Sequence, residues 1–180
     1  MHVVIEPGQF GFTNIGDVAM LQVTVARLKQ LVPLAELLVF TRDPENIRRM
    51  CSGAQPLDAT IRHVWVRERL FPYRIRRALK STYKSFLEPM ELHLRARWPR
   101  LWITADRIKN RFTASSSHTT ALSLLQLIES ASAFVLAGMG GMNDEFKDRA
   151  LEMLDLLRLA QSLGRKTVML SQGIGPISDP

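Results

Sequence analysis

The chain has 180 residues, of which 46% are hydrophobic, and its formal net charge is +7. This length and apolar content suffice for one buried core of the α/β type, and they exclude low-complexity and fibrous proteins. The single cysteine, Cys51, excludes an intramolecular disulfide and a cysteine-rich metal site.

The start of the chain carries no basic-then-apolar leader. No apolar run approaches the roughly 20 residues that cross a bilayer. We therefore expect a cytoplasmic protein, with any membrane contact limited to peripheral binding at the inner face of the membrane.

The positive charge is concentrated in one segment, from Arg67 to Arg111. This segment holds 13 Lys and Arg residues against four acidic residues, so the remainder of the chain has a charge of minus two. The basicity is therefore a property of the segment, and the surrounding chain has the charge balance of an ordinary domain.

Strand and helix patterns alternate along the chain in the order that a parallel α/β sheet requires. A β-branched run at 2–8 predicts the first strand, and apolar residues at helical spacing from Ile15 predict the first helix. Further on, we predict strands at 36–41, 61–66, 133–141 and 166–176, helices at 42–50, 121–131 and 144–163, and a polar loop at 113–120. The predicted fold is α/β: a Rossmann-like parallel sheet with helices on both faces, as a single domain over 1–180 with a basic, largely helical insertion at about 67–112.

Three predicted strands end in polar or glycine-rich turns: GQFGFTNIGD, AGMGGMND and SQGIGP. In a parallel sheet all carboxyl ends lie on one edge, where ligands bind, so we expect the three turns to converge. Glycines let the backbone approach a ligand, and amides at a helix start favour anionic groups. The candidate substrate-binding residues are Gly11, Asn14, Gly16, Asp17, Gly138, Gly140, Gly141, Asn143, Asp144, Gln172 and Gly173.

Each turn also has a purely structural interpretation. Asn14 and Asp144 are suited to cap helices, and Gly16 to relieve a tight turn. Asp17 has a further use, because a carboxylate in the first turn of a helix at this edge can take a proton from a bound hydroxyl. We name Asp17 as the candidate catalytic residue and keep the structural interpretation beside it.

The sequence contains no pattern typical of a nucleotide-cofactor site, a metal site or a serine-hydrolase site. The middle turn does not have GxGxxG spacing, and no phosphate loop of the GxxxxGK type is present, so neither a nicotinamide cofactor nor ATP is supported. The four histidines show no metal-ligand spacing, and no G-x-S-x-G elbow exists. We expect neither a metal nor a cofactor.

The basic segment combines charge with an apolar stripe. Ile75, Leu79, Tyr83 and Phe86 follow helical spacing, and the other faces carry the candidate anion contacts Arg74, Arg76, Arg77, Lys80 and Lys84. Such a helix can lie on an anionic membrane surface or beside a lipid-linked pyrophosphate. Alternatively, it packs its stripe on the domain and solvates its charge. No nucleic-acid-binding motif is present, and no nucleic-acid partner is expected.

Taken in order, the three turns resemble the polysaccharide pyruvyl transferase family. The resemblance rests on GFTNIGDVAMLQ, AGMGGMNDEF and KTVMLSQGIGP, and covers about 2–41 and 119–177. Two departures stand out: Val18 occupies the place of an acidic residue after the Gly-Asp pair, and Met139 interrupts the glycine run. The resemblance implies a two-domain architecture of the GT-B type, of which this chain is the N-terminal half and lacks the C-terminal domain.

The same resemblance implies transfer of an enolpyruvyl unit from phosphoenolpyruvate to two hydroxyls of a sugar, in cell-surface or exopolysaccharide synthesis. Asn14 and Asp17 then face the sugar or lipid-linked saccharide acceptor, and Asp144 and the later glycines shape the cleft. The basic donor-binding residues are expected in the absent half, so this chain alone is expected to be inactive. Two alternatives remain open: a sugar-nucleotide glycosyltransferase of the same plan, and a non-catalytic module that binds anionic lipid or nucleic acid.

Overall fold

The structure is a computed structural model that describes residues 1–8, 14–67, 71, 73–111, 117–138, 142–170, 173 and 175. At 63, 64, 66, 67, 73–75, 83, 84, 96, 103, 106, 107, 109–111 and 117–122 it describes the backbone only. The chain forms two compact units: unit 1 comprises Met1–Thr60 and Gln126–Pro180, and unit 2 comprises Ile61–Leu125. Among the described residues, no helix has the length and apolarity needed to cross a membrane.

Unit 1 is built on a five-stranded sheet in which every pairing is parallel. The strands are β1 (His2–Glu6), β2 (Glu36–Thr41), β3 (Ala54–Asp58), β4 (Ala131–Leu136) and β5 (Lys166–Met169), in the spatial order β3-β2-β1-β4-β5. The chain begins at the centre, moves outward to β3, and then returns to the other side of β1. The strand order therefore reverses direction between β1 and β4. The parallel pairings confirm the predicted α/β parallel sheet.

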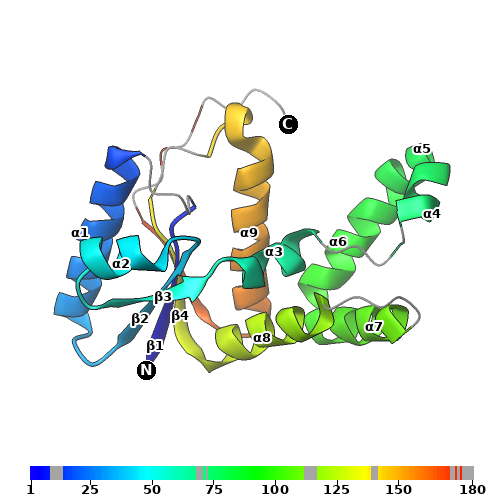
Figure 1. Cartoon of the computed structure of the whole chain (residues 1–180). Coiled ribbons are helices and arrows are strands. Elements are labelled where there is room, and N and C mark those ends of the chain that lie inside the picture. The colour runs from blue at the N-terminus through cyan, green and yellow to red at the C-terminus, as the bar shows by residue number, and fades with distance from the viewer. Residues whose placement is uncertain are drawn as a thin grey trace. The chain divides into compact units, whose positions relative to one another are not determined.

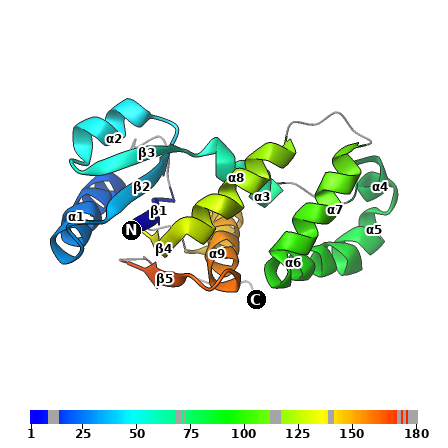
Figure 2. The same ribbon diagram turned by 90° about the horizontal axis from the view of Figure 1, so that it is seen from below.

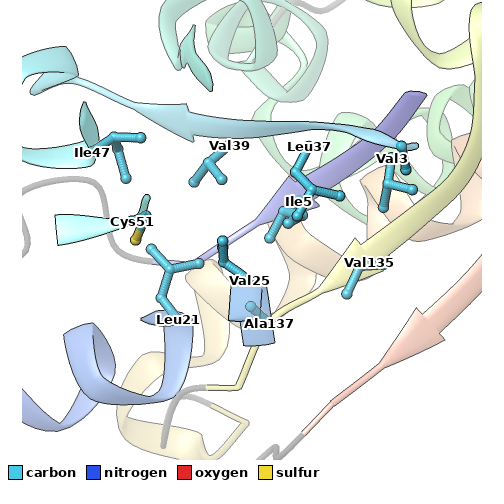
Figure 3. Packing of buried hydrophobic residues seen from close by; sticks show 11 residues of the cluster. Val3, Ile5, Leu21, Val25, Leu37, Val39, Ile47, Cys51, Val135 and Ala137 are labelled. Carbon is cyan, nitrogen blue, oxygen red and sulfur yellow. The ribbon is translucent and has the colours of Figure 1, made fainter. Parts of the chain in front are cut away.

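One face of the sheet is covered by α1 (Ile15–Leu31) and α2 (Pro44–Met50). Alternate strand residues point to this face, because successive side chains on a strand point to opposite sides. They join side chains of both helices in one aliphatic cluster (Figure 3), which comprises Val3, Ile5, Leu21, Val25, Ala35, Leu37, Val39, Ile47, Cys51, Val135 and Ala137. Leu21 and Val25 in this cluster pack α1 against the sheet.

The opposite face of the sheet is covered by α9 (Lys147–Ser162), which packs on β4 and β5. Both ribbon views show α1 and α9 on opposite sides of the strands (Figures 1 and 2). The helix buries Met153, Leu156 and Ala160. The helix ends at Ser162, and Gly164 follows it with a positive φ of 73°, which lets the next amide, that of Arg165, donate to the Ala160 carbonyl oxygen at 2.9 Å. The chain then enters β5.

Unit 2 contains the basic segment. Its elements are α3 (Thr60–Arg67), α4 (Tyr73–Ala78), α5 (Lys80–Thr82), a π-helical turn at Tyr83–Leu87, α6 (Glu88–Arg97), α7 (Pro99–Arg111) and most of α8 (Ser117–Ser130). The rings of Trp65 and Trp102 meet edge to face, with centroids 5.2 Å apart. The buried Arg95 guanidinium lies 5.3 Å from the Trp65 centroid and donates to the Trp65 carbonyl oxygen at 2.7 Å.

Two predicted elements in or beside this unit are wrong. The strand predicted at 61–66 is helix α3, whose start is fixed by Asp58: its carboxylate accepts from the Thr60 amide at 2.8 Å. The third strand is instead β3, where Pro56 is tolerated because the strand lies at the sheet edge. The helical spacing predicted from Ile75 to Phe86 falls on helical elements, α4, α5 and the π-helical turn, with a break at Leu79. The loop predicted at 113–120 already enters α8 at Ser117.

Candidate active site at the carboxyl ends of β1, β4 and β5

The candidate site lies where the strand order reverses. The three polar turns follow β1, β4 and β5, which are neighbours in the sheet. Backbone pairing continues past the strand ends: the Ala137 amide donates to the Glu6 carbonyl oxygen and the Leu170 amide to that of Leu136, both at 2.9 Å. The three turns therefore start side by side on the carboxyl edge. In sheets of this order, ligands bind in the crevice at that point.

The second and third turns are joined directly. The Gly175 amide donates to the Met142 carbonyl oxygen at 3.0 Å. Gly175 has a φ of 103°, a conformation that residues with a side chain rarely adopt, so its glycine identity is required by the backbone. Gly175 is not among the candidate residues predicted from the sequence. Its signal was present in the QGIGP turn, but a glycine needed for positive φ cannot be told from its neighbours by sequence alone.

In the polar turn that follows β1, Asn14 is the N-cap of α1. Its Oδ1 accepts from the Gly16 amide at 2.9 Å, as the structural interpretation proposed. A Cβ on Gly16 would lie 3.3 Å from that oxygen, so glycine leaves room for the cap. The cap uses the oxygen only, and the amide Nδ2 of Asn14 remains a donor that a substrate hydroxyl can accept from. Both residues are exposed.

Asp17 lies in the first turn of α1 and is half-buried. Burial raises the pKa of its carboxyl, because desolvation disfavours the charged form, and the positive charge of Arg149 partly offsets this increase. A carboxylate with a raised pKa is a better proton acceptor than an exposed one. The electrostatic influence of Arg149 also shows that α9 brings a cation close to the start of α1.

In the middle turn, Gly138 is buried directly after β4. Asn143 caps the short 3-10 helix Asp144–Phe146, and its Oδ1 accepts from the Phe146 amide at 3.1 Å. The cap is therefore Asn143, and the capping role considered for Asp144 is wrong. Asp144 is half-buried in the first position of this short helix.

Arg149 is the site residue that the sequence analysis missed. It lies in the first turn of α9, and its guanidinium stacks over the Phe146 ring at 5.7 Å from the centroid. A cation in the first turn opposes the helix dipole, an unfavourable placement of roughly 0.3–1 kcal/mol. No local pattern in the sequence marks Arg149, because its role depends on the start of α9 lying near the start of α1.

The remaining candidate residues fall into two groups. Gly11, Gly140, Gly141 and Gln172 lie outside the described residues, and Gly173 is described as exposed. In unit 2, Arg77 and Lys80 are exposed and Arg76 is half-buried, whereas the side chains of Arg74 and Lys84 are outside the description. Within the described part of the chain, no three His, Cys, Asp or Glu residues gather as metal ligands.

Comparison with known proteins gives one match. No curated protein and no solved structure matches the chain. The model of the family described as polysaccharide pyruvyl transferase matches residues 14–180. The match starts at the cap of α1 and includes all or part of each of the three turns around the crevice. The chain therefore belongs to the polysaccharide pyruvyl transferase family.

Proposed function

We propose that this chain is the acceptor-side domain of a pyruvyl transferase. The reaction moves an enolpyruvyl unit from phosphoenolpyruvate to two hydroxyls of a sugar in a cell-surface or exopolysaccharide precursor. One observation carries the proposal: in a chain of this family, Asp17 lies at the reversal of strand order, with a pKa raised by burial. This is the position and the chemistry that a base for a sugar hydroxyl requires.

The proposed reaction determines which groups the active site must supply. A proton is added to the methylene carbon of phosphoenolpyruvate, and a sugar hydroxyl oxygen bonds to the adjacent carbon as it loses its proton. The bond from that carbon to the phosphate oxygen then breaks, inorganic phosphate leaves, and the second hydroxyl closes the ketal. The steps need a base for the hydroxyls, an acid for the carbon, and positive charge for the departing phosphate.

We assign the base to Asp17 and sugar orientation to Asn14. The Nδ2 of Asn14 donates to a sugar oxygen while its Oδ1 holds the helix start, so one residue links the backbone geometry to the substrate. The glycines after β4 and β5 allow the sugar ring to approach the backbone. We assign the donor-binding basic groups to a second domain of the GT-B-type plan, so the 180-residue chain binds acceptor and forms no ketal alone.

The test titrates the 180-residue chain with methyl glycosides that differ in whether they carry a 4,6-diol, a hydroxyl pair able to close a cyclic ketal. We expect binding of diol-bearing sugars, a loss of affinity in Asp17→Asn, and no loss in Glu45→Gln. Glu45 is an exposed acid in the first turn of α2, away from β4, and is thus a matched control.

Two outcomes would change the assignment. Pyruvate ketal formed by the chain with phosphoenolpyruvate and sugar, detected by mass spectrometry, would overturn the acceptor-only role. Stabilisation against heat by a nucleotide-sugar, with none by any glycoside, would favour the glycosyltransferase alternative.

A further inference from the structure

The position of Arg149 in α9 is unfavourable for the stability of the helix. It lies in the first turn of α9, where the helix dipole disfavours a cation. Arg158, nine residues further along α9, is exposed in the C-terminal half of the helix and has no such conflict. A basic side chain held against the helix dipole indicates a use for its charge outside the helix.

The surroundings of Arg149 hold the side chain without neutralising it. Its guanidinium lies 5.7 Å from the Phe146 ring centroid, a stacking contact that leaves the N–H edge of the fork available. Within the described ranges, no carboxylate lies within ion-pair distance of this guanidinium. Asp17 is near enough to be influenced by its charge but forms no ion pair with it.

The topology places Arg149 at the same end of the sheet as Asp17. β1 and β4 are adjacent and parallel, and α1 and α9 follow them after their respective turns. Both helices begin at the same end of the sheet, on opposite faces (Figure 1). The starts of these two helices therefore bring a carboxyl group and a planar guanidinium group to the same edge of the sheet.

We propose that Arg149 binds a phosphate oxyanion of the substrate at this edge of the sheet, near Asp17. The inference deepens the proposed function and rests on it for the identity of the substrate. A guanidinium fork matches two phosphate oxygens in a bidentate contact. The oxyanion has two sources with the same chemistry: the pyrophosphate that links an acceptor sugar to its carrier, and the phosphate of phosphoenolpyruvate.

The test measures binding of inorganic pyrophosphate and of phosphoenolpyruvate to the 180-residue chain by calorimetry at fixed ionic strength. Because hydrogen bonds to charged groups are strong, we expect Arg149→Gln to weaken binding by at least about tenfold. Arg149→Lys keeps the charge but loses the fork, and should retain part of the affinity. Arg158→Gln removes the same charge from the same helix and should leave affinity unchanged.

The second readout is the pKa of Asp17 followed by carbon NMR, which tests whether Arg149 lies near Asp17. The positive charge of Arg149 lowers this pKa, so Arg149→Gln should raise it. Preference for pyrophosphate would assign the contact to the acceptor linkage, and preference for phosphoenolpyruvate to the donor.

Three results would overturn the inference: no binding of either anion by the natural chain, unchanged binding in Arg149→Gln, or an equal loss in Arg158→Gln. Glycoside titrations on the same samples separate this failure from failure of the proposed function. Sugar binding that requires Asp17 but not Arg149 leaves the function standing without the anion contact. Anion binding that requires Arg149, in a chain that binds no sugar, supports the anion contact and contradicts the proposed function.

Discussion

The two units bury different kinds of side chain. Unit 1 has an aliphatic cluster beneath α1 and α2 that includes the thiol of Cys51, and among its described residues it buries one charged side chain, that of Glu6. Unit 2 buries three, those of Arg62, Glu91 and Arg95, together with two tryptophans. Burial of aliphatic residues can be predicted from the sequence, because apolar residues recur at the spacing of a strand or a helix. Burial of charged groups depends on partners that are distant along the chain, because a buried charge must be paired or hydrogen-bonded. The units therefore differ in how their folds are encoded.

The chain supplies a separate probe for each unit. All three tryptophans (Trp65, Trp98 and Trp102) lie in unit 2, so intrinsic fluorescence reports on that unit. The single cysteine is buried in the cluster of unit 1, where burial also raises the pKa of its thiol. Thiol labelling of Cys51 therefore reports on the opening of unit 1.

The largest effect is expected from Ile5→Ala in unit 1. Ile5 is fully buried in the aliphatic cluster, and truncation should lower the free energy of unfolding by about 2–5 kcal/mol. Labelling of Cys51 should accelerate accordingly. The control Ile15→Ala, at a residue 85% exposed, should stay within about 0.5 kcal/mol. Equal losses in the two variants would show that the cluster is assigned wrongly.

In unit 2, Arg95→Met tests whether a buried cation contributes as much as aliphatic packing. The change removes the hydrogen bond to the Trp65 carbonyl and the contacts with both indole rings. Together these contribute about 2–4 kcal/mol, so the fluorescence-detected transition should move to lower denaturant. The exposed Arg97→Met is the control on the same helix. If Arg95→Met is as stable as the control, the buried cation does not contribute to the stability of unit 2.

The surface charge of unit 2 is tested with vesicles. Arg77 and Lys80 are exposed, together with the apolar side chains of Leu79 and Phe86. We predict binding to vesicles containing phosphatidylserine, weakened by about 1 kcal/mol for each of the two charges replaced by glutamine. Co-sedimentation at increasing salt measures this effect. Equal binding to neutral vesicles would contradict an electrostatic contact with the membrane.

The smallest effect concerns Asp17 and pH. Because burial raises the pKa of this carboxyl, its contribution to stability is fully present below the ordinary value of 3.8 and is lost as pH rises through the raised value. Asp17→Asn should therefore be slightly more stable than the natural chain at neutral pH, and this gain should vanish in acid. Denaturant unfolding across pH measures the difference. A variant less stable than the natural chain at neutral pH would show that the carboxylate is a structural cap.

Prediction from sequence succeeded where local signals agree with the fold. Asn14 before Ile15 and Asp43 before Pro44 mark helix starts that the structure contains, because each side chain accepts from an amide two or three residues later. It failed at 61–66, where an apolar run suits either a strand or a helix, and the edge strand around Pro56 lacks a strand pattern.

The candidate site shows the same division. Asn14, Asp17 and Asn143 were recognisable from turn and capping signals next to strands. Arg149 was not, because its role depends on the proximity of α1 and α9 across the sheet, which only the strand order reveals. Gly175 was missed because its amide bonds to Met142, far away in sequence.

Amide chemical-shift mapping with a diol-bearing methyl glycoside tests the central claim most directly, because it compares the two units in one experiment. The account predicts shifts that gather at the starts of α1 and α9 and at Gly138, Gly173 and Gly175, and that vanish in Asp17→Asn. Shifts confined to Ile61–Leu125, or unchanged by Asp17→Asn, would contradict an acceptor site at the carboxyl ends of β1, β4 and β5.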